Sequence, residues 1–326
     1  MKKKLKTIKN LNKGAVKKLP IFDGEKPLVT VLMTAYNAER FIKDSLESII
    51  SQTYKNLEII VVDDGSTDNT LKIVKNLQKI DKRIRVFQMK KNSGPSLASN
   101  FGIKKAKGEF IARMDADDIS FTDRIEKQVK FLRENPEVVL AGGQCVLING
   151  KGEVIGNKKF ALNHKDIYNS LFSVNPIQHP SCIVNMRLLP KSKFIYHNHS
   201  VLAHDLELVF ELSQYGKLAN LNDEILFYRQ YPSSLSLRNP KETFKATIEI
   251  RKKALKVYGY KPTLFGWVTH FGQIILVSCL PNFLVYPIFA FLKGLMPLKN
   301  MIPKLSFKPF SFFVSPRIEP STAKIG

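Results

Sequence analysis

Cysteine and tryptophan are scarce in this chain of 326 residues, which contains three of the first and one of the second. Cys145, Cys182 and Cys279 are an odd number and show no C-x-x-C spacing, so the sequence predicts neither a disulfide framework nor a zinc site. We expect reduced thiols in a cytosolic compartment. The hydrophobic fraction of 44% argues against an intrinsically disordered chain, and the length is sufficient for a large core.

Acidic residues are rare at the two ends of the chain. Residues 1–18 contain eight lysines and no acid, residues 238–261 eight bases and two acids, and residues 293–326 six bases and one acid. Residues 19–237 carry 29 bases and 25 acids, so the net charge of +23 lies mainly outside the body of the chain. A nucleic-acid-binding domain would carry its positive charge on the fold itself, so no nucleic-acid partner is predicted.

Charged residues are absent from residues 262–292, a largely apolar stretch that Pro281 and Asn282 interrupt. A spanning helix needs about 20 apolar residues, and the bases on both sides of the stretch mark both ends as cytoplasmic. The sequence therefore predicts a re-entrant or interfacial helix–break–helix on the cytoplasmic face of the inner membrane, where anionic lipid attracts the flanking lysines. The alternative is a helical hairpin packed on the domain.

Three regions are predicted from this charge pattern. Residues 1–26 form a basic arm that lacks the apolar segment of a secretory signal, and it is either a lipid-surface arm or a solvated tail. Residues 27–237 form the main domain. Residues 238–326 form a basic and apolar region that associates with the membrane.

Strands and helices alternate in the first part of the main domain. Apolar, β-branched runs predict strands, and apolar residues at helical spacing predict helices. Such alternation is typical of an α/β fold with a mostly parallel, Rossmann-like sheet flanked by helices. The predicted strands are residues 28–35, 57–62, 84–89 and 109–114, and the predicted helices are residues 38–53, 67–80 and 96–107.

Acidic residues gather where these strands end. In a parallel sheet, ligands bind beyond the carboxyl ends of the strands. Clustered carboxylates would repel one another without a cation, and hard oxygen ligands suit Mg²⁺ or Mn²⁺. The five acids are Asp63, Asp64, Asp115, Asp117 and Asp118. For Asp118 and for Asp123, helix capping or solvation is the favoured interpretation.

Four motifs in order resemble glycosyltransferase family 2 across residues 27–231. They are VTVLMTAYNAE (residues 29–39), VVDDGSTD (61–68), NSGPSLASN (92–100) and MDADDISFTDRIEKQ (114–128). The resemblance implies a GT-A fold and transfer of a sugar from a nucleotide diphosphate with inversion at the anomeric carbon. Beyond residue 236 the resemblance is much weaker.

The resemblance also implies roles for individual residues at the donor side. Thr34 and Tyr36 match the part of the first strand that contacts the nucleotide, and the ring of Tyr36 is suited to stacking on the base. Asp64 matches the acid that binds a pyrimidine, which favours a uridine donor. Asp115 matches the first acid of the D-x-D motif, near the ribose, and Asp117 matches the second, which reaches the metal.

A catalytic base is expected at the start of a helix after the sheet, where the family usually has an E-D pair. The sequence VLAHDLELVFELSQY (residues 201–215) places Asp205 at the Asp and His204 where the Glu would be. Asp205 is the predicted base. The departure at His204 leaves open whether His204 or Glu207 shares its work, and a helix-capping role for Asp205 is the alternative.

Further contacts are less specific. His179, in the sequence QHPS, resembles the strand that borders the acceptor, and Arg229, followed by serines 233, 234 and 236, resembles a late loop over the diphosphate. A surface ion pair is the alternative for Arg229. His197 and His199 are interpreted as solvated loop residues rather than metal ligands.

Together these features predict an inverting transferase that uses Mn²⁺ or Mg²⁺ and adds single sugars to a lipid-linked saccharide for surface polysaccharide or lipopolysaccharide. A sugar-nucleotide nucleotidyltransferase would need a basic, Gly-rich loop after the first strand, where this chain has TAYNAE. An oxidoreductase would need G-x-G-x-x-G there. A membrane adaptor without enzymatic activity explains the charged ends but not the clustered acids.

Overall fold

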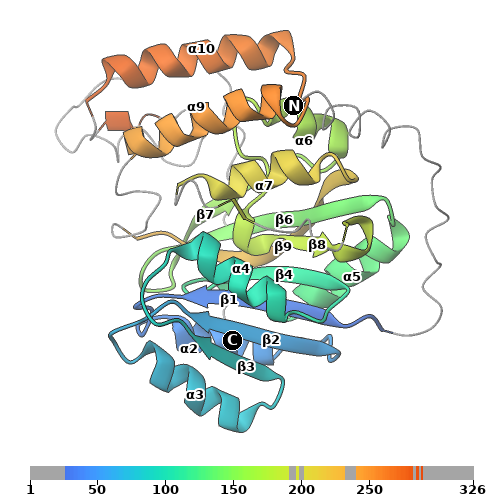
Figure 1. Ribbon diagram of the computed structural model, residues 1–326, viewed down its shortest axis with the longest axis vertical. Helices are drawn as coiled ribbons and strands as arrows, with labels where there is room; N and C mark the ends of the chain where they lie inside the picture. Colours follow the sequence, from blue (N-terminus) through green and yellow to red (C-terminus); the bar gives the residue numbers. More distant parts are fainter. Residues whose placement is uncertain are drawn as a thin grey trace.

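The first half of the chain alternates strands and helices, as its hydrophobic pattern predicts (Figure 1). The structure, a computed structural model, describes residues 26–190, 196–197, 202–231, 240–281, 284–285 and 288. The first elements, close to the predicted ones, are β1 (Val29–Ala35), α2 (Ile42–Ile50), β2 (Leu57–Asp63), α3 (Thr70–Ile80), β3 (Ile84–Gln88), α4 (Pro95–Lys105) and β4 (Phe110–Asp115). Most of the predicted basic arm and the three serines after Arg229 lie outside the described residues.

The second half contains shorter strands and more irregular connections. Its elements are β5 (Ile119–Ser120), α5 (Arg124–Glu134), β6 (Val138–Ile148), β7 (Val154–Lys158), α6 (His164–Ser170), η1 (His179–Ser181), β8 (Ile183–Asn185), η2 (Met186–Leu188), α7 (His204–Leu212), β9 (Lys217–Arg229), α9 (Pro240–Lys256) and α10 (Leu264–Cys279).

The strands form one nine-stranded sheet in the order β3-β2-β1-β4-β8-β6-β9-β5, with β7 paired to β6. The first four strands of this order, β3, β2, β1 and β4, run parallel. The prediction of a mostly parallel sheet is wrong for the other half, because β8, β5 and β7 run antiparallel to their neighbours. β5 and β8 have only two and three residues, which is too short to leave a periodic signal in the sequence.

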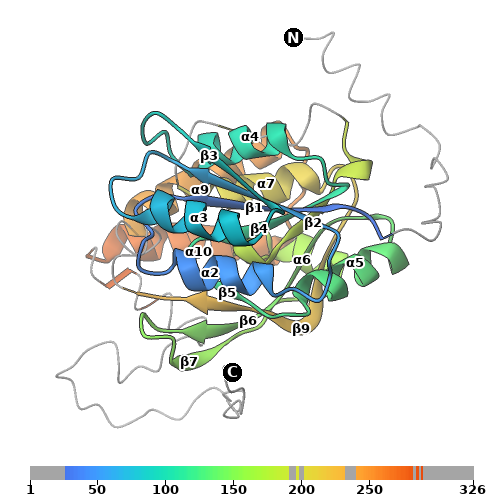
Figure 2. The same cartoon turned by 90° about the horizontal axis from the view of Figure 1, so that it is seen from below.

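Alternating residues of the strands face two separate cores. Val29, Val31 and Met33 of β1 pack with α2, α3 and α5, whereas Leu32 faces the core that α4, α7 and α9 cover. Both faces of the parallel half are therefore buried, as its continuous apolar runs require. Figure 2 shows the helices on the two sides of the sheet.

The charge-free stretch forms helix α10, which ends before Pro281 as the predicted break requires. Figure 1 shows α10 stacked on α9, at the opposite end of the molecule from α3. Across the described part of the chain, no helix has both the length and the apolar content needed to cross a bilayer. Most of the predicted second helix lies outside the described residues.

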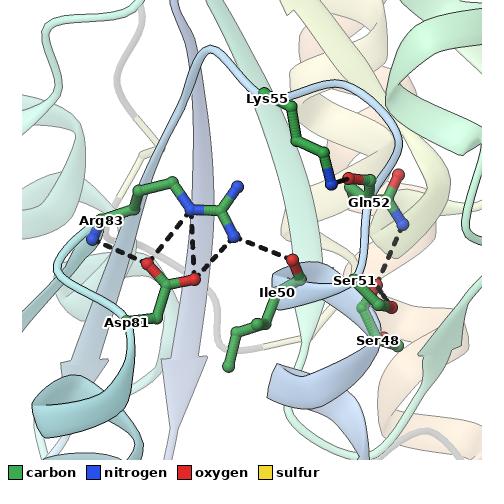
Figure 3. Close-up of polar contacts among 7 residues, drawn as sticks. All are labelled: Ser48, Ile50, Ser51, Gln52, Lys55, Asp81 and Arg83. Carbon is green, nitrogen blue, oxygen red and sulfur yellow. Dashed lines mark hydrogen bonds and ion pairs between the residues drawn. The ribbon is translucent and has the colours of Figure 1, made fainter.

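A network of polar contacts anchors the end of α2 to the turn before β3 (Figure 3). The Arg83 guanidinium donates to both carboxylate oxygens of Asp81, from Nε to Oδ1 at 3.1 Å and from Nη2 to Oδ2 at 2.6 Å, and its Nη2 donates to the Ile50 carbonyl at 2.8 Å. Ile50 is the last residue of α2, where carbonyls lack partners within the helix. Hydrogen bonds from Arg83 lower the pKa of the Asp81 carboxyl below its ordinary value.

Arg83→Met is expected to lower the free energy of unfolding by about 2 kcal/mol at pH 7, because both a half-buried carboxylate and a helix-end carbonyl lose their donor. Asp81 has its pKa lowered in the fold, so its contribution is present above its unfolded pKa and is lost as the pH falls. The decrease in unfolding free energy caused by Arg83→Met should therefore be smaller at pH 3 than at pH 5. Urea unfolding of the wild type and the variant at pH 5 and at pH 3 measures this difference. Lys82→Met, at an exposed neighbour, is the control, and an equal loss in both variants would contradict the assignment.

Candidate active site

Strands β1, β2 and β4 end at one edge of the sheet. Thr34 lies opposite Asp115 across β1 and β4, and Ala35 lies opposite Asp63 across β1 and β2. This carboxyl edge is where parallel sheets bind ligands. The register therefore gathers three predicted donor-side residues, Thr34, Asp64 and Asp115, in one place.

Tyr36 extends from this edge with 47% of its surface exposed. The next residue, Asn37, has a left-handed φ of 48°, which Asn tolerates better than most residues. Its Oδ1 accepts a hydrogen bond from the Thr67 backbone N–H at 2.9 Å, and its own N–H donates to Ser66 Oγ at 3.0 Å. These bonds join the loops after β1 and β2 and leave the Tyr36 ring accessible for stacking.

Asp64 is buried and organises the loop that leads into α4. One of its carboxylate oxygens accepts from the Ser93 backbone N–H at 2.9 Å, and the other from the Gly94 N–H at 2.8 Å. Burial nevertheless raises the pKa of this carboxyl, and the neighbouring charge of Asp63 adds to the rise. Because a carboxylate oxygen accepts more than one hydrogen bond, contact with a nucleobase remains open to Asp64.

Three carboxylates of the D-A-D-D sequence crowd the end of β4. Burial raises the pKa of Asp115 to about 6, with the Arg113 guanidinium opposing the rise and the charge of Asp117 adding to it. Burial also raises the pKa of Asp117. The pKa of Asp118 lies well above its ordinary value because of burial and the two neighbouring charges. The site therefore concentrates negative charge.

Asp205 stands at the start of α7, which begins at His204. Ala203 turns the chain into the helix with a left-handed φ of 57°, an uncommon conformation for a residue other than glycine. Asn175 Nδ2 donates to Asp205 Oδ2 at 2.7 Å and so orients the carboxylate. The Asp205 charge raises the pKa of Asp115. The predicted base and the D-A-D-D acids are therefore close enough to interact.

Three aromatic rings lie in edge-to-face contact beside Asp205. His179 and His204 are 5.5 Å apart between centroids, and Tyr196 lies 5.6 Å from each of them. His179 Nε2 and the Tyr196 hydroxyl form a hydrogen bond of 2.7 Å. Burial and the Arg113 charge lower the pKa of His179 well below its ordinary value, so this imidazole is neutral near pH 7.

Comparison with known proteins identifies the family. Residues 30–191 match the family model described as glycosyl transferase family 2. An uncharacterized glycosyltransferase of Haemophilus influenzae is 35% identical over 240 residues, which are 71% of this chain and 74% of that protein. The chain belongs to glycosyltransferase family 2. TuaG of Bacillus subtilis, named provisionally as a teichuronic acid biosynthesis glycosyltransferase, is 41% identical over 109 residues, which are 33% of this chain and 43% of TuaG.

Solved structures show that this family 2 glycosyltransferase has a GT-A-like fold. Residues 1–349 of S. aureus TarS, in complex with UDP-GlcNAc, give a TM-score of 0.56 at 20% identity, over 69% of this chain and 66% of that fragment. The mannosyltransferase PcManGT of Pyrobaculum calidifontis, in complex with GDP-Man and Mn²⁺, gives 0.52 at 17% identity, over 89% and 86%. Family membership does not favour the adaptor or nucleotidyltransferase alternatives.

Two expectations about this glycosyltransferase are corrected by the geometry. Asp118 is neither solvated nor a helix cap, because it is 1% exposed and accepts a hydrogen bond from the Arg229 backbone N–H at 2.8 Å. Arg229 is the last residue of strand β9 rather than part of a late loop, and it forms no ion pair with the residues that the structure describes. It is 5% exposed, and its guanidinium donates to the backbone carbonyls of Asp117 at 2.7 Å and Asn149 at 3.1 Å. Arg229 therefore binds the backbone of the turn that carries Asp117.

Two further side chains have structural partners. Glu207, a candidate helper of the base, is 5% exposed and binds Lys253 and the Tyr258 hydroxyl, so it joins α7 to α9 and to the segment after α9. His197 is not merely solvated, because its Nε2 pairs with Glu211 at 2.9 Å. His199 lies outside the described residues.

Asp117 and Asp115 fit the divalent cation that the family implies. Both are half-buried, and Mg²⁺ and Mn²⁺ typically take one or two protein carboxylates and complete their shell with substrate phosphates. Asp117 Oδ2 accepts from the Tyr231 hydroxyl at 2.8 Å, which orients the group. Within the described ranges, no three or more His, Cys, Asp or Glu side chains are grouped so that they could hold a metal ion.

Sequence reasoning missed four residues of the site. The sequence could have indicated Arg113, because residues two apart in a strand share a face and Arg113 precedes Asp115 by two. It is 1% exposed, and its Nη2 lies 3.8 Å from Asp115 Oδ1. The others, Asn175, Lys158 and Tyr231, reach the acids only through tertiary contacts. Lys158 donates to Gln178 Oε1 at 2.6 Å, and the Asp205 charge opposes the lowering of its pKa by burial.

Asp115→Asn is expected to stabilise the ligand-free protein at pH 7.5. The pKa of Asp115 is raised in the fold, so the folded state binds more protons than the unfolded state between about pH 4 and pH 6, and stability falls as the pH rises through this window. Asp115 is partly exposed, which reduces the effect. An increase in Tm of about 2 °C at pH 7.5, and less at pH 4, is expected. A decrease at pH 7.5 would contradict it, and Asp123→Asn is the control.

Proposed function

We propose that this glycosyltransferase moves a sugar from a uridine nucleotide donor to a hydroxyl of a lipid-linked saccharide, with inversion, on the cytoplasmic face of the inner membrane. The observation that carries the proposal is the strand register that brings Thr34, Asp64 and Asp115 to one carboxyl edge of the sheet. It is supported by Asp205 in the first turn of α7, whose carboxylate is oriented by Asn175. One group of residues can thus hold the donor while another takes a proton from the acceptor.

Asp205 acts as the general base in this mechanism. Its carboxylate, oriented by Asn175, removes the proton of the acceptor hydroxyl. The acceptor oxygen attacks the anomeric carbon from the face opposite the diphosphate, and the bond from that carbon to the diphosphate oxygen breaks with its electron pair on the nucleotide. Attack from the opposite face inverts the configuration. His179 and His204, beside Asp205, are proposed to contact the acceptor or the diphosphate.

The donor side is assigned to residues at the strand ends. Thr34 and Asp115 are proposed to contact the nucleoside, Tyr36 to stack on the base and Asp64 to bind the pyrimidine. Asp117, with Asp115, would hold Mn²⁺ or Mg²⁺. When bound, the cation would act as a Lewis acid that stabilises the negative charge developing on the departing diphosphate. A diphosphate contact is not assigned to Arg229, because its Nε and Nη1 are bound to backbone carbonyls.

The support for a lipid-linked acceptor is less specific than the support for the donor. The relative TuaG is named for teichuronic acid biosynthesis, which agrees with a role in surface polysaccharide. The basic ends of the chain and its charge-free apolar segment agree with an acceptor that lies in a membrane. Lipopolysaccharide and capsule belong to the same class of product.

Thermal stabilisation by nucleotides tests the donor assignment. Ligand binding to the native state raises Tm, by the equivalent of ~2.7 kcal/mol when the ligand is at 100 times its Kd. UDP, GDP and CDP are added in turn, each with and without Mn²⁺ or Mg²⁺. We expect stabilisation by UDP that needs the metal. A response to GDP or CDP alone would overturn the uridine assignment, and no response in folded protein would count against a transferase.

A further inference from the structure

Helix α10 presents two different faces. Its inner face packs on the domain, where Arg251 Nη1 donates to His270 Nδ1 at 3.0 Å and to Gln273 Oε1 at 2.9 Å. The ring of Phe172 lies 5.0 Å from that of Trp267 and 4.8 Å from that of His270. These contacts fix the rotation of the helix and therefore determine which side chains point outward.

The outer face of α10 is apolar and exposed. Leu264, Val268, Phe271 and Ile275 follow one another at intervals of four, three and four residues, so they lie along one side of the helix. Their exposed fractions run from 55 to 82%, and Phe265 beside them is 73% exposed. We call these five side chains the α10 face. Scattered apolar residues on a surface are ordinary, but a continuous stripe of this kind marks a binding surface.

Exposed lysines lie on the elements that adjoin α10. They are Lys252 and Lys256 of α9 and Lys261 of the segment that joins α9 to α10, and Lys252 forms an ion pair with Glu249 at 2.8 Å. The sequence of α10 itself contains no Asp, Glu, Lys or Arg. An apolar stripe with lysines on adjoining elements complements the interface of an anionic bilayer, where negatively charged headgroups cover the hydrocarbon.

We propose that the α10 face is the lipid-contacting surface of this protein, with α10 lying in the plane of an anionic membrane and the three lysines against its headgroups. The inference rests on the proposed function in one respect, since it explains how the enzyme meets a lipid-linked acceptor. Helix α9 and the segment after it connect this surface to the site, because Lys253 of α9 and Tyr258 of that segment both bind Glu207 of α7, two residues beyond Asp205. Docking of α10 therefore orients the base relative to the lipid.

Vesicle sedimentation of the full chain tests the proposal. The probes are vesicles of phosphatidylglycerol with phosphatidylethanolamine, and neutral vesicles of phosphatidylcholine. Val268→Gln/Phe271→Gln/Ile275→Gln should bind anionic vesicles at least tenfold more weakly than the wild type, because three apolar side chains no longer gain by leaving water. Substituting the three lysines by Gln should weaken binding to anionic vesicles roughly fivefold per lysine and leave binding to neutral vesicles unchanged.

The matched control carries the same kind of change at exposed apolar residues elsewhere. Ile80, Val154 and Ile155 are 78, 41 and 51% exposed, and their triple Gln variant should bind vesicles like the wild type. Unchanged vesicle binding by the α10 variant would overturn the proposal. A change in its molar mass by light scattering, without a change in vesicle binding, would also overturn it and assign the face to contact between copies.

Nucleotide response separates this proposal from the proposed function. The α10 variant should keep the Tm of the ligand-free wild type and its stabilisation by UDP and metal, because no contact given for the described residues joins the α10 face to the site. Wild-type protein that binds vesicles through α10 but ignores every nucleotide would support the membrane surface while contradicting the transferase. The reverse result would retain the transferase and reject the surface.

Discussion

Asp205→Asn is expected to reduce sugar transfer by ~10²–10⁴-fold while leaving nucleotide binding unchanged. The amide keeps the size of the carboxylate, and its oxygen can still accept the hydrogen bond from Asn175. It cannot take a proton from the acceptor hydroxyl. The loss should therefore appear in kcat, with UDP stabilisation equal to that of the wild type.

The matched control for this variant is Asp166→Asn. Asp166 also lies in the first turn of a helix, α6, but it is exposed and pairs with Asn163. Its substitution should leave transfer intact. Near-normal turnover by Asp205→Asn would move the base to another residue, and His204 would then be the first to test. Loss of UDP stabilisation in Asp205→Asn would instead indicate damage to the donor site.

Asp117→Ala is expected to abolish metal-dependent binding of UDP. The variant removes the carboxylate that Tyr231 orients toward the acidic turn, and a diphosphate alone cannot approach the remaining acids without a neutralising cation. The stabilisation of ~2.7 kcal/mol expected at 100 times Kd should disappear. Isothermal calorimetry with UDP and Mn²⁺ measures the same loss directly.

Two further variants make this result specific to the metal. Asp123→Ala removes an acid of the same chain segment that pairs with the partly exposed Lys127, and it should bind UDP and Mn²⁺ like the wild type. Tyr231→Phe keeps Asp117 but removes its hydroxyl partner, so we expect weaker metal binding rather than none. Unchanged UDP binding by Asp117→Ala would show that the cation, if one is used, is held elsewhere.

Local pattern was sufficient for much of the fold. The buried runs that became β1, β2 and β4 are continuous and β-branched, and the intervening helices carry apolar stripes, so each element could be predicted by itself. Parallel pairing then placed Thr34, Asp64 and Asp115 together without any knowledge of side-chain contacts. The acids were found from sequence because strand ends in a parallel sheet share one edge.

Contacts between distant segments were beyond such reasoning. The serines after Arg229 resemble a late loop of the family and so predict a loop position for it, but β9 buries it, and its Nε donates to the backbone carbonyl of Asp117, 112 residues away in sequence. The sequence favours a capping or solvated role for Asp118, whereas in the structure its carboxylate accepts a hydrogen bond from the Arg229 backbone N–H of the same strand. Nothing in the residues next to either one indicates these partners.

The sequence by itself determined the family, the parallel half of the sheet and the acidic edge, because each depends on short motifs and on the periodicity of buried residues. Only the tertiary structure decided how that edge is supported, which face of α10 is exposed and that Asn175 orients Asp205. These features depend on packing between elements that lie far apart in the chain. Side-chain burial and hydrogen-bond partners are set by such packing, so they could be assigned only after the chain was folded.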